Sequence, residues 1–242
     1  CRKNFVLDVV SPAELINLVQ DYKGQVNKVL VKSELGKVRL AVASDIETFL
    51  MMSWVNYLLG GVYKQWEGNT LEEDILTQTN RMVKMLELCR KCFGVPYDYD
   101  GFEHQPTTDE LKTIVRNLCS KARLNVPGYY QPTFDTVANK ILSGFNNSVL
   151  ILYHLGKSLE WMVTGGLMSG MRWTSVIGNA WNTIMTNAML KLLAEVGINT
   201  DTIERYIRGD DSAIFAINAA TARLVALGYK RVGAKGGAGK FS

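Results

Sequence analysis

Near the C-terminal end of the chain, two runs of β-forming residues flank a glycine and two aspartates. The sequence reads RYIRGDDSAIFA over residues 205–216. Glycine and aspartate are poor strand formers and common turn residues. The stretch therefore predicts a β-hairpin with arms over Thr202–Ile207 and Ser212–Ile217 and with Asp210 and Asp211 at its turn. Such a turn either simply reverses the chain or holds a metal ion, and the stretch alone fits both.

Apolar periodicity along the rest of the chain predicts a mixture of helices and strands. Helices are expected over Pro12–Val31, Ile46–Leu59, Thr77–Cys92, Thr108–Arg123, Thr174–Val196 and Ala219–Leu227. Strands are expected at Lys32–Ser44, in FGVPYDYDGF and at Val149–Tyr153, with an irregular segment over Pro127–Lys140. Because helices and strands alternate irregularly, we predict an α+β fold rather than a regular parallel sheet.

Composition narrows the class of protein. Of 242 residues, 47% are hydrophobic and 21% are charged, which is typical of a folded globular protein. The longest apolar candidate, Phe49–Tyr63, is too short and too interrupted for a membrane span. The net charge of +4 is compatible with a nucleic-acid partner. The chain opens on Cys1 without a signal-peptide pattern, so we expect a fragment of a longer polypeptide.

The cysteines suggest neither disulfides nor zinc. Four cysteines at irregular spacing do not make a disulfide framework, and a reducing compartment is the better fit. Cys89 and Cys92 form a C-x-x-C pair, with His104 and Cys119 as the nearest further ligands of zinc type. Structural zinc sites usually have a second tight pair of ligands. We therefore expect these cysteines to lie on an ordinary helix.

A second group of acids could complete a metal site with the hairpin turn. Asp98 and Asp100 follow a strand-like run in PYDYDGFEHQ. Each acidic segment alone is most simply a solvated turn. Phosphoryl transfer, however, depends on positioning and charge neutralisation. Two divalent ions about 3.5–4 Å apart can provide these when carboxylates from different segments hold them. Hard oxygen ligands of this kind suit Mg²⁺.

A glycine-rich segment joins a loop to a long predicted helix. In GGLMSGMRWTSVIGNAWNT, residues 165–183, the hydroxyl and amide groups of Ser169, Thr174 and Asn179 lie near the helix start. Glycines permit close backbone approach, and polar groups at a helix start can bind a sugar or a phosphate. Taken alone, such a segment is usually a helix cap.

A cluster of cations lies on the first predicted strand. KSELGKVRL carries Lys32, Lys37 and Arg39, and strand alternation places Lys37 and Arg39 on the same face. Such a pair can neutralise a triphosphate. The simpler interpretation of this segment is a solvated strand edge.

Taken in order, these segments resemble the motif series of viral RNA-directed RNA polymerases. KSELGKVRLAVAS resembles the basic motif F, PYDYDGFEHQ motif A, SGMRWTSVIGN motif B and RGDD motif C, and GYKRVGAKGGAGKFS resembles the region of motif D. The D-Y-D-x-F and S-G-x-R-x-T patterns are most similar to the totivirus-like viruses with double-stranded RNA. A three-residue motif alone is weak evidence, whereas four motifs in the correct order are specific.

The resemblance implies a role for each matching residue. Asp98 and Asp210 would bind two Mg²⁺ or Mn²⁺ ions, with Asp211 adjacent and supporting. Lys235 or Lys240 would protonate the leaving pyrophosphate. The implied nucleotide-binding residues are Lys32, Lys37, Arg39, Glu103, Ser169, Gly170, Thr174 and Asn179.

Two positions depart from the family pattern. Motif B usually has an asparagine four residues after its threonine, where this chain has Gly178 and then Asn179. Motif A commonly has Asp or Asn where this chain has Glu103. Both positions normally help to recognise the ribose, so the resemblance leaves the basis of sugar selection open.

The resemblance also implies an architecture: a right-hand polymerase palm, an antiparallel sheet backed by helices, with fingers segments and without the thumb. We predict a fingers segment with motif F over residues 1–75 and a palm segment with motif A over 76–125. A fingers insertion over 126–164 and a palm segment with motifs B, C and D over 165–242 follow. We expect this piece to polymerise poorly by itself.

The implied function is RNA-directed RNA polymerisation for viral transcription and replication. Expected partners are the RNA template, nascent RNA, nucleoside triphosphates and a viral capsid protein, with no membrane partner; the sequence leaves open whether the capsid protein is fused upstream. The expected location is the virion interior or the host cytoplasm. A reverse transcriptase-like polymerase is one alternative, although those enzymes usually carry an aromatic residue where this chain has Arg208. A non-catalytic, palm-like RNA-binding domain is the other.

Overall fold

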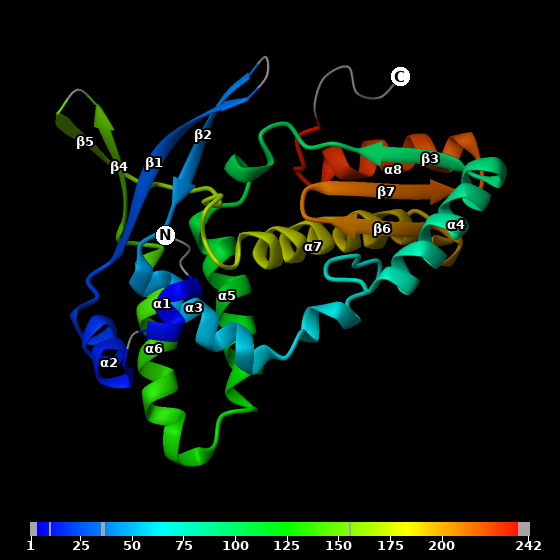
Figure 1. The fold of residues 1–242 in the computed structure, drawn as a ribbon. Helices are drawn as coiled ribbons and strands as arrows, with labels where there is room; N and C mark the ends of the chain where they lie inside the picture. Colours follow the sequence, from blue (N-terminus) through cyan, green and yellow to red (C-terminus); the bar gives the residue numbers. More distant parts are fainter. Residues whose placement is uncertain (1–3, 10, 35–36, 155, 237–242) are drawn as a thin grey trace. The chain divides into compact units, whose positions relative to one another are not determined.

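The chain forms two compact units, and each is built from two separate stretches of sequence. A computed structural model describes residues 4–9, 11–34, 37–154 and 156–236 (Figure 1). Unit 1 combines residues 1–61 with 106–174, and unit 2 combines residues 62–105 with 175–242.

Unit 1 contains a layer of helices whose ends follow local capping signals. They are α1 (Asn4–Val9), α2 (Pro12–Asp21), α3 (Ile46–Leu59), α5 (Thr108–Arg123) and α6 (Gln131–Gly144), with the 3₁₀ turn η3 (Gly128–Tyr130). Asp45 caps α3 by accepting a hydrogen bond from the Thr48 N–H at 2.6 Å. Thr107 and Glu110 form a capping box at the start of α5. Helix α5 packs against α3 and α6, which buries the apolar face of α5.

The sheet of unit 1 is mixed. In its described part it has four strands, in the order β2 (Lys37–Ala43), β1 (Gln25–Glu34), β4 (Ser148–His154) and β5 (Lys157–Met162). Strands β1 and β4 run parallel, and the outer pairs are antiparallel. The side chain of Asn27 donates to the hydroxyl of Ser148 at 2.9 Å, which ties β1 to β4 inside the unit.

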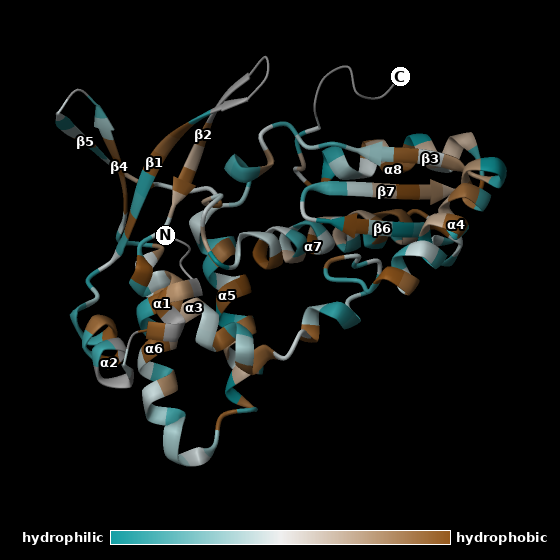
Figure 2. Cartoon of the chain, in the orientation of Figure 1, coloured by the Kyte–Doolittle hydropathy of each residue, from teal (hydrophilic) through white to brown (hydrophobic). Residues whose placement is uncertain are grey.

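Unit 2 contains a purely antiparallel sheet, as predicted for the palm. Its described part has three strands, in the order β3 (Phe93–Tyr97), β7 (Asp211–Ala216) and β6 (Glu204–Arg208). Its helices are α4 (Ile75–Lys91), α7 (Thr174–Glu195) and α8 (Ala219–Arg231), with the 3₁₀ turns η1 (Val62–Gln65), η2 (Phe102–His104) and η4 (Thr200–Thr202). Strand β7 is hydrophilic at the turn and hydrophobic further along (Figure 2).

The predicted α+β composition is correct, but two segments differ from their prediction. The expected helix over Pro12–Val31 ends at Asp21, because the chain passes through Lys23–Gly24 and then enters β1. The segment predicted to be irregular forms η3 and α6. Pro132 sits in the first turn of α6, where its missing N–H costs nothing.

The two units also divide the chain differently from the predicted boundaries. We assigned residues 76–125 and 165–242 to the palm, whereas residues 106–125 and 165–174 lie in unit 1. The physical reason is that α5 buries its apolar side chains against α3 and α6. The sequence pattern identified the helix correctly but carried no information about its neighbours.

Aromatic side chains form much of the interior of unit 2. The rings of Tyr97 and Tyr229 stack with centroids 4.1 Å apart, and Tyr99 and Phe102 pack edge-on against Trp181 at 5.6 and 5.4 Å. All of these side chains are buried, so they pack rather than offer faces to bases. In unit 1, Trp173 is also fully buried, as expected for an aromatic residue beside a helix start.

No helix within the described ranges is both long enough and apolar enough to cross a bilayer.

The buried tyrosines predict a loss of stability at alkaline pH. Burial raises the pKa of Tyr229 from 10.0 to about 12. Between these values the unfolded chain releases the proton and the folded chain keeps it, so the free energy of unfolding should fall as pH rises. We expect a slope of about 1.4 kcal/mol per pH unit from this residue, measured by urea unfolding between pH 9 and 12.

Tyr229→Phe should reduce this slope. Tyr57→Phe, at a side chain that is 83% exposed, serves as the control and should leave it unchanged. An unchanged slope in Tyr229→Phe would contradict the assignment.

Candidate active site

The predicted hairpin is present, and its turn has two residues. Strand β6 ends at Arg208 and β7 begins at Asp211, which leaves Gly209 and Asp210 at the turn. Gly209 has φ of +63°, a left-handed conformation that glycine adopts without strain. Asp210 is exposed at the tip.

The register of the sheet brings the two acidic segments to one edge. Strands β3 and β7 pair antiparallel, and their last partners at this edge are Tyr97 and Ser212. The next residues along each chain are Asp98 and Asp211. In an antiparallel ladder, Cα atoms of opposite residues lie about 4.5–5.5 Å apart. The pairing therefore brings the segments that carry Asp98 and Asp211 to the same edge of the sheet.

Burial alternates along both strands at this edge. Tyr97, Tyr99 and Ser212 are buried, whereas Asp98 is half-buried and Asp211 is exposed. Because successive side chains of a strand point to opposite faces, Asp98 and Asp211 share the face turned away from the aromatic interior.

The long helix α7 supports the turn from below through asparagines. Asn179 accepts a hydrogen bond from the Gly209 N–H at 2.9 Å and donates to the side chain of Asn69 at 2.8 Å. We predicted Asn179 as a nucleotide contact. It is fully buried and both ends of its amide are bonded inside unit 2, while a contact with the nucleotide stays a prediction.

Sequence reasoning missed Asn182, which lies one helical turn further along α7. Its amide donates to the Gly209 carbonyl at 2.9 Å, and its oxygen accepts from the hydroxyls of Tyr99 and Ser212 at 2.8 and 2.9 Å. Burial raises the pKa of Tyr99 well above its ordinary range, so this hydroxyl remains a donor. The spacing of Asn179 and Asn182 was the available signal, since positions three apart share a helix face.

The C-terminal tail lies beside the loop that follows Asp98. Tyr99 and Gly236 form an antiparallel bridge, and the Asp100 N–H donates to the Lys235 carbonyl at 2.9 Å. The side chain of Gln105 also bonds the Lys235 backbone. Lys235 is exposed next to the motif A loop, and Lys240 lies outside the described residues. Glu103 is exposed on η2.

The cations of the predicted motif F lie on the β1–β2 hairpin of unit 1. Lys32 on β1 is paired with Arg39 on β2, and Lys37 is paired with Glu34. Lys32 is exposed. The register therefore gathers the three basic positions on one hairpin, whereas the sequence predicted a single strand over Lys32–Ser44.

The glycine-rich loop of unit 1 is attached to β2. The Ser169 hydroxyl accepts from the Val42 N–H at 3.2 Å, and the Ser44 hydroxyl donates to the Gly170 carbonyl at 3.1 Å. Thr174 donates its hydroxyl to the carbonyls of Met168 and Met171 within the loop. Ser169 keeps an exposed side chain, whereas the Thr174 hydroxyl is bonded within the loop.

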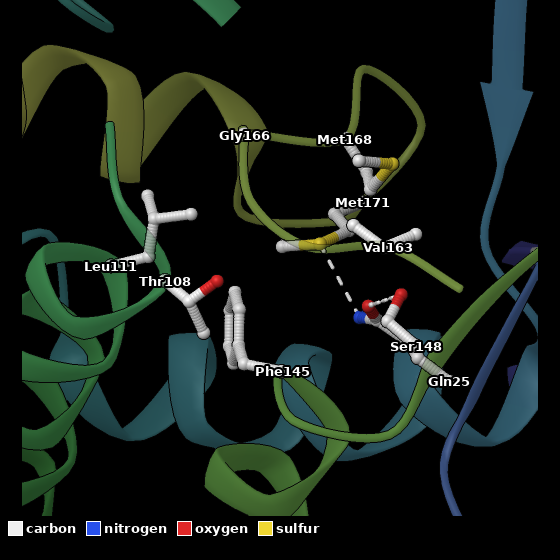
Figure 3. A pocket seen from close by; sticks show the side chains of 9 residues that line it. All are labelled: Gln25, Thr108, Leu111, Phe145, Ser148, Val163, Gly166, Met168 and Met171. Atoms are coloured by element: carbon white, nitrogen blue, oxygen red, sulfur yellow. Dashed lines mark hydrogen bonds between the residues drawn. The ribbon is translucent and has the colours of Figure 1, made fainter. Parts of the chain in front are cut away.

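Beneath this loop is a small cavity of about 10 Å³ (Figure 3). Met171 accepts a hydrogen bond from Gln25 at 3.3 Å, and Gln25 in turn accepts one from Ser148 at 3.2 Å. A cavity of this size holds at most one water molecule, so it is no site for a nucleotide.

Comparison with known proteins identifies the family. The model for viral RNA-directed RNA polymerases matches residues 17–241. The chain belongs to this family. It is also 25% identical over 192 residues to the probable RNA-directed RNA polymerase of Giardia lamblia virus (isolate Wang). This agreement confirms the expected resemblance to totivirus-like polymerases. The match covers 77% of the chain and 10% of that relative.

The family implies a polymerase palm fold, and the antiparallel sheet of unit 2 is consistent with it. Of the predicted residues, the palm edge gathers Asp98, Asp210, Asp211 and Lys235. The predicted nucleotide-binding residues of the basic hairpin and the glycine-rich loop up to Thr174 belong to unit 1, whereas Glu103 and Asn179 belong to unit 2. A match to RNA polymerases favours that class over the reverse transcriptase alternative.

The described residues contain no group of three or more His, Cys, Asp or Glu side chains placed to hold a metal ion. Cys89 and Cys92 are among the described residues, so they too belong to no such group. Asp98, Asp210 and Asp211 therefore do not form such a group, and a site that pairs the carboxylates of Asp98 and Asp210 stays a prediction. Such a pair suits Mg²⁺, which keeps several water ligands and takes others from substrate phosphates.

A larger groove of about 530 Å³ lies elsewhere in unit 2, beside α4 and the start of β6. Its cations already have partners: Arg81 with Glu73, Lys84 with Glu204, and Arg205 with Glu67. None of the predicted site residues lines it. We therefore place the candidate site at the palm edge rather than in this groove.

The attachment of the glycine-rich loop predicts a strong effect of Gly170→Ala. A methyl group at this position would overlap the Val42 carbonyl and lie 2.8 Å from the Ala43 Cα, and backbone atoms cannot yield as a side chain can. We expect a loss of about 2–3 kcal/mol in the free energy of unfolding, measured by urea titration. Gly165→Ala is the control, because its new methyl group would meet no atom within 4 Å. Equal stability of the two variants would contradict the close approach.

Proposed function

We propose that this chain forms the catalytic palm and part of the fingers of a viral RNA-directed RNA polymerase. It would transfer nucleotides from nucleoside triphosphates to the 3′-hydroxyl of a primer or nascent RNA, as directed by an RNA template. The chain spans about a tenth of the length of the relative that it matches. The activity of the whole polymerase is therefore proposed for this chain.

The reaction forms a bond between the 3′-oxygen and the α-phosphorus. The bond between the α-phosphorus and its bridging oxygen breaks, and pyrophosphate leaves. Two bound Mg²⁺ or Mn²⁺ ions would activate the attacking oxygen and stabilise the leaving one. Asp98 and Asp210 would hold these ions, with Asp211 in support.

The pairing of β3 with β7 carries this proposal. It supports the proposal because it brings the motif A and motif C segments to one sheet edge, although they lie far apart in the sequence. At this edge, the tyrosine side chains are on the face toward the interior of unit 2, and the aspartate side chains are on the opposite face. A hairpin that merely reverses the chain does not require a second acidic segment beside it.

Basic residues would balance the negative charge of the bound triphosphate. Lys32, Lys37 and Arg39 would neutralise the phosphates of the incoming nucleotide. Lys235 would donate the proton to the leaving pyrophosphate, with Lys240 as the alternative. The position of the Lys235 backbone beside Asp100 supports the first choice.

Ribose selection would rest on a different residue from the one expected. The buried amide of Asn179 is bonded within the palm, whereas Glu103 is exposed five residues after Asp98. We propose that Glu103 contacts the ribose and that Ser169 and Gly170 contact the template or the nascent base pair.

The partners follow from the same proposal. Template and product RNA would be held largely through their phosphates, so affinity should fall steeply as salt rises. We propose contact with the viral capsid protein and a location in the virion interior or the host cytoplasm.

The decisive test combines incorporation and metal binding for the 242-residue chain. On a primed RNA template with labelled nucleotide, we expect weak but measurable incorporation. Asp210→Asn should lower the rate at least about 100-fold, because loss of a metal ligand removes several kcal/mol of transition-state stabilisation. The same variant should abolish the rise in melting temperature caused by Mn²⁺.

Asp201→Asn is the matched control, because Asp201 is an exposed aspartate on η4 of the same unit. It should retain both activity and the Mn²⁺ effect. RNA binding without any dependence on metal, and with no incorporation by the unsubstituted chain, would instead support the RNA-binding alternative. A preference for deoxynucleotides would support a reverse transcriptase.

A further inference from the structure

We infer that Asn182 is a positioning residue that sets the spacing between the motif A aspartate and the motif C turn. This inference rests on the proposed function and deepens it. Asn182 would touch neither metal nor nucleotide, and would act through the backbone and hydroxyl groups that flank the carboxylates.

Three hydrogen bonds of Asn182 reach both acidic segments. The bond to the Gly209 carbonyl holds the residue before Asp210. The bond from Ser212 holds the residue after Asp211, and the bond from Tyr99 holds the residue after Asp98. One side chain of α7 therefore contacts a direct sequence neighbour of each acid of the proposed site.

The peptide groups of the turn are fixed at both ends by the same helix. The Gly209 N–H donates to Asn179 at 2.9 Å, and the Gly209 carbonyl accepts from Asn182 at 2.9 Å. In Figure 1, α7 runs alongside the β6–β7 hairpin. The orientation of the turn is therefore set by the helix as well as by its own strands.

The chemistry of the site requires an asparagine. Its amide nitrogen serves the carbonyl acceptor, while its oxygen serves two hydroxyl donors. An ionised aspartate would turn an oxygen toward the Gly209 carbonyl, and a leucine of similar size would leave the partners without hydrogen bonds. Asn182 has no exposed surface, so water cannot replace these bonds.

The test compares metal dependence in Asn182→Leu and in a matched control. Thr186→Val removes a buried hydrogen bond of 2.7 Å to Tyr229 from the same helix, one turn away from Asn182. Both variants should lower the melting temperature. Mn²⁺ affinity is measured by titration with electron paramagnetic resonance, which reports metal binding without catalysis.

Asn182→Leu should weaken Mn²⁺ binding roughly tenfold, in the range typical for loss of an outer-shell partner of a metal site. It should raise the Mg²⁺ concentration for half-maximal incorporation by a similar factor. Thr186→Val should change both values by less than about twofold. Metal dependence that is unchanged in Asn182→Leu, or shifted equally in Thr186→Val, would overturn the inference.

Tyr99→Phe provides the same test if Asn182→Leu does not fold. It removes the hydroxyl donor and keeps the ring that packs against Trp181. We expect a shift of metal affinity in the same direction, about threefold. An unshifted Tyr99→Phe in that case would overturn the inference.

Failure of the proposed function gives a different result. If the unsubstituted chain binds Mn²⁺ no better than Asp210→Asn, the metal site itself is absent and both proposals fall. If Asp210→Asn abolishes binding but Asn182→Leu and Tyr99→Phe do not weaken it, the function stands and the role of Asn182 is refuted.

Discussion

The architecture of the candidate site depends on the central position of β7 in its sheet. This strand pairs with β6 through a two-residue turn and with β3 through a ladder that ends at Tyr97 and Ser212. A slip of one residue in either pairing would turn the buried isoleucine and serine positions outward and the aspartates inward. Burial of Ile214 and Ser212 therefore fixes the register that aligns Asp98 with the turn.

Beneath that sheet, α7 buries polar groups among its apolar side chains. Asn179, Asn182 and Thr186 are all fully buried, and each has a hydrogen-bond partner. A buried amide is costly unless its bonds are made, and fully bonded it favours one arrangement over its competitors. These residues stabilise the fold little on balance, but they discriminate strongly between one position of the catalytic turn and another.

The sequence predicted much of this site because its signals are local. The hairpin around Gly209 and the acids after a strand at Asp98 follow from turn chemistry and strand propensity. Helix α3 was predicted with the bounds that it has. The incorrect part of the secondary-structure prediction depended on contacts with residues that are distant in the sequence. Helix α6 carries the periodic positions Phe134, Val137, Ala138 and Ile141, but a proline and clustered polar residues obscured them.

Asn182 illustrates the same limit at a single residue. Its spacing from Asn179 shows that the two side chains share a helix face, but it does not show what that face contacts. Its role is defined by Tyr99 and Gly209, which lie on separate segments, so the partners become visible once the chain is folded. Asn179 shows the same limit, because its motif position predicts a nucleotide contact, whereas its burial and its bonds to Gly209 and Asn69 become visible once the chain is folded.

The interleaving of the two units has a consequence for synthesis of the protein. Strand β3 and Asp98 belong to the first stretch of unit 2, while β7 belongs to its second stretch. At about 5–20 residues per second, a ribosome needs roughly 6–23 s to travel from residue 98 to residue 211. During that interval unit 1 can gather all of its sequence, whereas β3 waits with an unpaired edge. The two halves of the proposed metal site would thus meet only after residue 211 has been made.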